Sequence, residues 1–108
     1  MLTETLAQYL RTIQNGTQRC RAIARELGVA PATVTVTLRR LMRYGWVDYA
    51  AGVASITPEG ARQLEYIRRT SASITRLLTA QGMTQHDAEV QSWAWAVSIT
   101  PETQSALV

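Results

Sequence analysis

The chain has 108 residues and a formal net charge of +3, and its eleven basic residues are all arginines. This length suits one domain or one small domain with an appendage, and a single cysteine excludes both a disulfide framework and a cysteine-rich zinc site. No apolar run approaches the roughly 18 residues that span a bilayer, and no signal-peptide pattern follows Met1, so we expect a cytoplasmic protein with no membrane partner.

The first predicted helix is a packing helix. Leu6, Leu10 and Ile13 recur at helical spacing, and Tyr9 lies beside them. Thr3 suits the N-cap position, and the pair at residues 15–16, Asn-Gly, suits the end of the helix.

The segment from Cys20 to Gly45 predicts two helices that are joined by a tight turn. Gly28 suits a left-handed residue after the first helix, and Pro31 suits the first turn of the second. We place Arg21 and Ala30 at the two N-caps, where both are poor capping residues. The expected buried stripes are Cys20, Ile23, Ala24 and Leu27 in the first helix, and Val34, Leu38, Leu41 and Met42 in the second. This pattern is a helix-turn-helix.

The outward face of the second helix is the candidate DNA-reading surface. Threonine hydroxyls and arginine guanidiniums bind phosphate oxygens, and short apolar side chains can contact thymine methyl groups in a major groove. Ala32 and Val36 are the candidates for the methyl contacts; the alternative is an ordinary solvated helix face. The full predicted set is Ala32, Thr33, Thr35, Val36, Thr37, Arg39, Arg40 and Arg43.

After Gly45 the pattern predicts a two-stranded wing and then a long exit helix. Residues 46–50 and 53–57 form the strands, and Thr57 caps the helix, with Leu64, Ile67, Ile74, Leu77 and Leu78 on its apolar side. This order is that of a winged helix-turn-helix, a mainly α fold. The wing has no Arg or Lys between residues 46 and 60, so we expect it to contribute little to DNA binding.

A last helix is predicted from about Gln85 to Ser98, with Thr84 as its cap. This helix is unusually apolar, so its tryptophans either cover the core of the same chain or are buried between two subunits. We favour a dimer interface formed by Trp93, Trp95 and Val97. The expected domains are therefore a winged helix-turn-helix over residues 1–66 and a short helical dimerisation region over residues 67–108.

The sequence resembles the diphtheria toxin repressor and manganese transport regulator family (DtxR/MntR), the metal-activated winged-helix repressors of bacteria. The resemblance covers nearly the whole chain and implies a homodimer that is switched on by Fe²⁺, Mn²⁺ or a similar ion. The family continues into further dimerisation helices and often an SH3-like domain, whereas this sequence ends soon after Glu102. The segments that carry the resemblance are Tyr9–Ile13, Ile23–Val34, Arg40–Val47, Thr57–Gly60, and Trp95 followed by Ile99–Glu102.

The positions where this resemblance places the metal ligands carry unsuitable side chains. They are Gln8, Arg11, Ser71, Thr75, Trp93, Ala96 and Val97, with Glu89 at an ancillary position. Only Glu89 is a good ligand, and Arg11 brings a permanent positive charge to a cation site. We therefore predict a divergent member of the family with no metal and no cofactor. A weak metal site near His86 and Glu89 is the alternative to an exposed histidine.

Together these features predict a sequence-specific regulator of transcription, a homodimeric repressor that binds double-stranded DNA without metal. Two alternatives stay open: a winged-helix module that pairs with and modulates another regulator, and a metal-responsive regulator with a non-standard site. We do not expect an enzyme or catalytic residues, because the sequence has no Cys/His couple, no phosphate-binding glycine loop and no convergent carboxylate pair.

Overall fold

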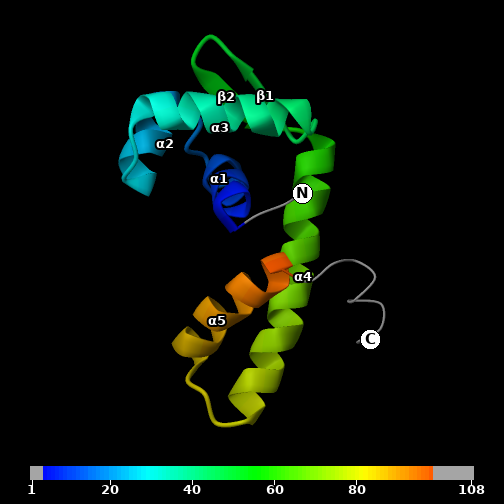
Figure 1. Ribbon diagram of the computed structural model, residues 1–108. Coiled ribbons are helices and arrows are strands. Elements are labelled where there is room, and N and C mark those ends of the chain that lie inside the picture. The colour runs from blue at the N-terminus through cyan, green and yellow to red at the C-terminus, as the bar shows by residue number, and fades with distance from the viewer. Residues whose placement is uncertain (1–3, 99–108) are drawn as a thin grey trace. The chain divides into compact units, whose positions relative to one another are not determined.

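The computed structural model describes residues 4–98, which form five helices and one two-stranded sheet (Figure 1). The expected cap Thr3 and the Ile99–Glu102 motif lie outside the described residues. The described chain divides into two compact units, one over Thr5–Leu64 and a second that contains residues 65–98 together with Glu4. The elements in order are α1 (Glu4–Gln14), α2 (Cys20–Leu27), α3 (Pro31–Arg43), β1 (Val47–Ala50), β2 (Val53–Ile56), α4 (Pro58–Ala80) and α5 (Gln85–Ser98).

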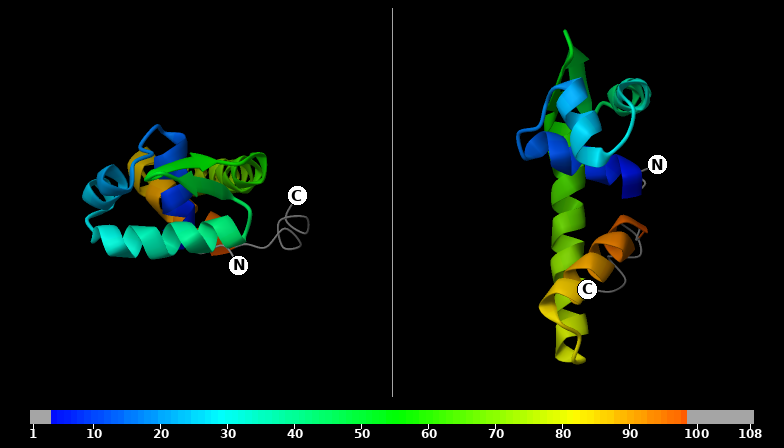
Figure 2. Two further views of the ribbon diagram at one scale, coloured as in Figure 1. Left: turned by 90° about the horizontal axis from the view of Figure 1, so that it is seen from above. Right: turned by 90° about the vertical axis from the view of Figure 1, so that its left-hand side faces the viewer.

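The first unit is a winged helix-turn-helix, which confirms the predicted fold class. α3 contacts both α2 and β1, and the β1–β2 hairpin follows directly on α3 (Figures 1 and 2). Leu6, Leu10 and Ile13 of α1 are buried, as their spacing predicts. No helix within residues 4–98 is long and apolar enough to cross a membrane.

The turn between α2 and α3 has the predicted chemistry. Gly28 adopts the left-handed conformation (φ 69°), and its backbone N–H donates to the Ala24 carbonyl. Only glycine adopts this conformation without a steric cost, so the helix ends there. Ala30 is the N-cap of α3 and Pro31 its first helical residue, and neither supplies a side-chain cap.

The N-cap of α2 is Arg19, one residue before the helix, whereas the sequence pointed to Arg21. Arg19 is extended and pairs with Val53 of the wing, while the backbone N–H of Cys20 donates to the Gly52 carbonyl at 3.1 Å. The wing thus satisfies a backbone donor at the start of α2, which a side-chain cap would do in an isolated helix. A local pattern could not reveal this tertiary partner.

The wing is a tight antiparallel hairpin with Val47 opposite Ile56 and Ala50 opposite Val53. Its two turn residues, Ala51 (φ 53°) and Gly52 (φ 76°), both have positive φ. Such a turn matches the right-handed twist of the two strands, so the hairpin closes with only two connecting residues.

Two predicted buried stripes differ from the structure. Met42 is 43% exposed and Leu77 is 68% exposed, although both were expected to face inward. In α3 the buried stripe is Val34, Thr37, Leu38 and Leu41. At 100° per residue Met42 lies at the edge of that stripe rather than at its centre.

Thr57 fixes the start of α4. Its hydroxyl donates to the Gly45 carbonyl at 2.6 Å and accepts from the backbone N–H of Gly60 at 3.1 Å, which confirms the predicted cap. In the same first turn, the hydrogen bond and positive charge of Arg62 hold the pKa of the Glu59 carboxyl below its usual value. The start of α4 is therefore tied to Gly45, two residues after the end of α3.

In the second unit α5 turns back beside α4 (Figures 1 and 2). Thr84 caps α5 as predicted, because its hydroxyl accepts from the Asp87 backbone N–H at 3.3 Å. The buried residues of α5 are Ala88, Ser92 and Ala96, a stripe of small side chains at four-residue spacing. Thr75 of α4 donates a hydrogen bond to the Ser92 hydroxyl at 2.9 Å, which joins the two helices.

Replacing Gly60 by alanine should destabilise the protein. A Cβ at this position would overlap the Trp46 carbonyl oxygen and press on Ile56, and a backbone atom cannot move aside cheaply. We expect Gly60→Ala to lower the free energy of unfolding in urea by about 2 kcal/mol, as overpacking does.

The matched control for this prediction is Gly45→Ala. A Cβ there meets nothing within 4 Å, so the cost should be only that of the left-handed conformation, about 1 to 2 kcal/mol. An alanine in an otherwise free helical position stabilises by up to about 1 kcal/mol relative to glycine. A stabilised Gly60→Ala variant would therefore contradict the proposed close contact.

Candidate nucleic-acid interface

The outer face of α3 combines apolar and positively charged side chains. Val36 is 59% exposed, although it is a β-branched aliphatic residue in the middle of the helix. The exposed residues that the sequence predicted for DNA binding are Ala32, Thr33, Val36, Arg39, Arg40 and Arg43. A surface of this kind can bind phosphate oxygens and contact base edges at the same time.

Two residues that the sequence predicted to contact DNA instead make hydrogen bonds within the protein. Thr37 is only 9% exposed, and its hydroxyl donates to the Thr33 carbonyl at 2.9 Å. Thr35 is half-buried; its hydroxyl donates to the Pro31 carbonyl at 3.2 Å and lies 3.5 Å from the Cys20 sulfur of α2. Thr37 lies on the same buried face of α3 as Val34 and Leu38, so its side chain packs inside the unit.

The structure adds residues at the carboxyl end of α3 that the sequence did not indicate. Met42 and Tyr44 are exposed there, and the Tyr44 ring packs on Trp46 with ring centroids 4.9 Å apart. The exposed wing residues include Asp48 and Ser55 but no cation. The positive charge of this part of the unit therefore belongs to α3 itself.

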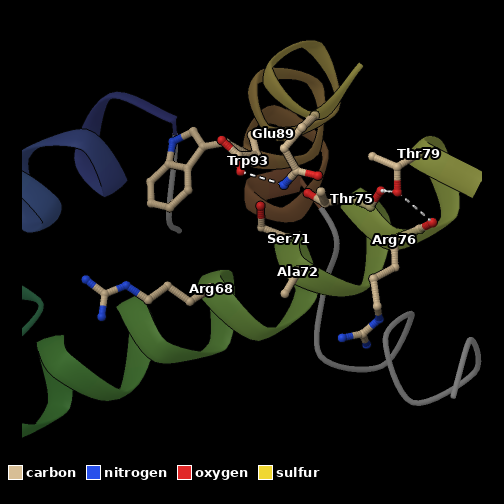
Figure 3. A pocket seen from close by; sticks show the side chains of 9 residues that line it. Arg68, Ser71, Ala72, Thr75, Arg76, Thr79, Glu89 and Trp93 are labelled. Atoms are coloured by element: carbon tan, nitrogen blue, oxygen red, sulfur yellow. Dashed lines mark hydrogen bonds between the residues drawn. The ribbon is translucent and has the colours of Figure 1, made fainter. Parts of the chain in front are cut away.

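In the second unit, four positions that the family resemblance assigned to metal ligands line one pocket. They are Ser71, Thr75, Glu89 and Trp93, and the other lining residues are Arg68, Ala72, Arg76, Thr79 and Gln85 (Figure 3). The pocket has a volume of about 390 Å³. The signal for it in the sequence is the spacing on α4, where residues 68, 71, 72, 75, 76 and 79 share one helical face.

These pocket residues offer little to a cation. Thr75 is hydrogen-bonded to Ser92, and the Glu89 carboxylate accepts from the Gln85 amide at 2.7 Å. Of the remaining assigned positions, Ala96 is buried, and Gln8 and Arg11 belong to the first unit. Within residues 4–98 no three His, Cys, Asp or Glu side chains are grouped so that they could hold a metal, and His86 is exposed.

The predicted dimer residues differ in exposure. Trp95 is 46% exposed, whereas Trp93 and Val97 are half-buried. Two further apolar side chains of the second unit are open to solvent, Val90 (62%) on α5 and Leu77 on α4. The small residues of α5 are thus covered, while several of its large apolar residues are not.

The first unit therefore has a winged helix-turn-helix fold, of the kind found in transcription regulators. Residues 1–52 match the family model described as "Iron dependent repressor, N-terminal DNA binding domain", which confirms the resemblance inferred from the sequence for this part of the chain. No curated protein matches the chain.

Solved structures extend the likeness over the described fold. A hypothetical protein of Sulfolobus solfataricus is 26% identical, with a TM-score of 0.84 over 98% of this chain and 86% of that one. IdeR of T. acidophilum is 17% identical with a TM-score of 0.65, over 95% of this chain and 50% of its own. MepR, a transcription regulator of the Staphylococcus aureus multidrug efflux pump MepA, is 18% identical with a TM-score of 0.62, over 99% and 81%. IdeR and MepR share the fold of this chain.

Proposed function

We propose that this protein is a sequence-specific DNA-binding regulator of transcription that represses as a homodimer and needs no metal. The observation that carries this proposal is the outer face of α3, where Arg39, Arg40 and Arg43 stand beside the exposed Val36. A regulator of this kind acts where the chromosome lies, so we propose a cytoplasmic location and no catalytic role. The match to a repressor DNA-binding domain over residues 1–52 supports the same conclusion.

In this proposal α3 enters the major groove. A groove about 12 Å wide admits one helix, and residues near the helix start reach the base edges. Ala32, Thr33 and Val36 therefore face the bases, and the three arginines bind phosphates or guanine. The wing, which lacks cations, adds only backbone N–H groups and hydroxyls such as that of Ser55.

Loss of one α3 arginine should reduce the salt dependence of DNA binding. If Arg40 neutralises one phosphate, Arg40→Ala should lower the slope of log affinity against log salt by about one and weaken binding to all sequences alike. The duplex comes from a selection of bound genomic fragments, and the measurement is fluorescence anisotropy at several salt concentrations. Arg62→Ala is the matched control, because Arg62 pairs with Glu59 on α4. Equal slopes for Arg40→Ala and the wild type would remove Arg40 from the interface.

Val36 should read thymine methyl groups. Burying one methyl group contributes about 0.8 kcal/mol, or roughly a factor of four in affinity. Replacing single thymines of the selected duplex by uracil should therefore weaken wild-type binding about fourfold at one or two positions. Val36→Ser should lose this discrimination, whereas Arg40→Ala should keep it. If uracil is tolerated everywhere, α3 does not read thymine methyls through Val36.

The open apolar side chains of the second unit support a homodimer. Trp95, Val90 and Leu77 would otherwise stay in water, and tryptophan is enriched where subunits meet. We expect light scattering after size exclusion to give a dimer, and Trp95→Ser to weaken it at least about tenfold, a typical effect of losing a central aromatic contact. Gln91→Ser, at an exposed position of the same helix, should change nothing.

The same measurement separates the leading proposal from the second candidate function. A wild-type chain that stays monomeric at micromolar concentration would favour a module that pairs with another regulator through the Trp95 surface. A stable homodimer favours the repressor.

Packing between α4 and α5 supports independence from metal. The Thr75–Ser92 hydrogen bond joins the two helices, and the buried stripe of α5 is built from small side chains. We expect thermal melts and operator binding in EDTA to equal those in excess Mn²⁺, Fe²⁺ or Zn²⁺. A metal at 100 times its dissociation constant would raise stability by about 2.7 kcal/mol. A rise of this size on adding metal would overturn this part of the proposal. If the rise disappeared in His86→Ala, the metal would bind at His86.

A further inference from the structure

The side of α3 that points most directly away from the core is half apolar and half cationic. The exposed residues opposite the buried stripe of this helix follow one another at spacings of four, three and four residues, so they form one line along it. This line, the outer stripe, consists of Ala32, Val36, Arg39 and Arg43. Both views of Figure 2 place α3 at the edge of the first unit, with no other element of that unit over its outer side.

The apolar half of the outer stripe can recognise only one kind of group on a base edge. Val36 is 59% exposed, and Ala32 lies one turn before it. Neither side chain can hydrogen-bond, so any contact with a base has to be apolar. In the major groove the apolar group is the C5 methyl of thymine. A cytosine that is methylated at C5 presents the same methyl group at the same ring position.

Arg39 follows Val36 by three residues and is available for a base contact. Its guanidinium makes no hydrogen bond or ion pair in the part of the chain that the structure describes. Arginine binds O6 and N7 of guanine with two hydrogen bonds, the commonest specific contact in the major groove. Three residues advance a helix by about 4.5 Å, close to the spacing of about 3.4 Å between successive base pairs. A helix that lies along the groove thus brings Val36 and Arg39 to neighbouring base pairs.

Arg40 occupies a different place on the helix. It lies to one side of the outer stripe, next to Thr33. A side chain in that place points toward the edge of the groove, where the phosphates are. Arg40 therefore suits the phosphate contact proposed above, and Arg39 suits a base.

We propose that the outer stripe recognises a two-base step, a pyrimidine with a C5 methyl group beside a guanine of the same strand. Val36 contacts the methyl group and Arg39 binds the guanine. Side chains on one face of a helix contact successive bases principally of one strand, as in zinc fingers. The pyrimidine is thymine or C5-methylcytosine, because both carry the methyl group.

An unmethylated cytosine at the same position lacks the apolar contact. Methylation of that cytosine at C5 therefore strengthens binding, which makes the modified base a regulatory signal for this surface. This recognition of methyl groups rests on the proposed function, because it requires α3 to lie in the major groove.

Four duplexes that differ at one base pair test the methyl contact. The starting duplex comes from the genomic selection, and the position is the thymine whose replacement by uracil weakens wild-type binding most. The four duplexes carry thymine, uracil, cytosine or C5-methylcytosine there, each with its complementary base. We expect the affinity ratios of thymine to uracil and of C5-methylcytosine to cytosine both to be about fourfold, the effect of one buried methyl group. Each ratio compares bases that differ by the methyl group alone, so the change of base pair cancels.

A pair of valine variants assigns the methyl contact. Val36→Ser should bring both ratios close to one, because it removes the exposed apolar side chain. Val29→Ser is the matched control, since Val29 is the exposed valine of the turn before α3. The same substitution there should leave both ratios unchanged.

A pair of arginine variants assigns the guanine contact. Replacing the neighbouring guanine by 7-deazaguanine removes the N7 acceptor and should weaken wild-type binding about tenfold, as the loss of a hydrogen bond to a charged group implies. Arg39→Ala should be insensitive to this replacement. Arg40→Ala, which lies off the outer stripe, should stay as sensitive as the wild type.

Three results would contradict this recognition of a methylated step while leaving the proposed function intact. They are a uracil-sensitive thymine with no guanine beside it on its strand, equal binding of the cytosine and C5-methylcytosine duplexes, and sensitivity to 7-deazaguanine that persists in Arg39→Ala. If the wild-type protein binds no duplex in the genomic selection, the proposed function fails as well.

Discussion

The Thr57 hydroxyl links parts of the first unit at the point where three elements meet. It donates to the carbonyl of Gly45, two residues after the end of α3, and it accepts from the backbone N–H of Gly60 in the first turn of α4. Immediately beside it, Gly60 lies against the Trp46 carbonyl with no room for a side chain. The end of α3, the base of the wing and the start of α4 thus share one small contact region, so the direction in which α3 presents its arginines depends on it.

The second unit differs from the first in which side chains it buries. In α5 the fully buried residues are small, and the exposed residues include the large apolar Val90 and Trp95. Large apolar side chains are usually buried, so the unit on its own leaves apolar surface in water. The small buried side chains let the helix backbones approach closely. The pocket between α4 and α5 shows a second departure from the usual pattern, because most of the side chains there are charged or polar rather than aliphatic.

Local chemistry in the sequence predicted most element boundaries. The left-handed glycine after α2, the proline at the start of α3, and the caps Thr57 and Thr84 each act through atoms within four residues, so a pattern can reveal them. The cap of α2 was missed because its partner is the wing, more than 30 residues away. Met42 and Thr37 were misplaced because the centre of a buried stripe depends on how the helix is rotated against its neighbours. The spacing on α4 indicated one wall of the pocket, but the other wall required the three-dimensional structure, because α5 supplies Gln85, Glu89 and Trp93 from a second helix.

The exclusive use of arginine on the exposed face of α3 has a chemical consequence. Lysine side chains can be acetylated or can lose their proton when they are desolvated, whereas guanidinium groups keep their charge through such changes. The electrostatic attraction of α3 for a polyanion is therefore constant with pH and is not open to control by amine modification. A signal that adjusts this attraction therefore cannot act by acetylating a lysine of α3.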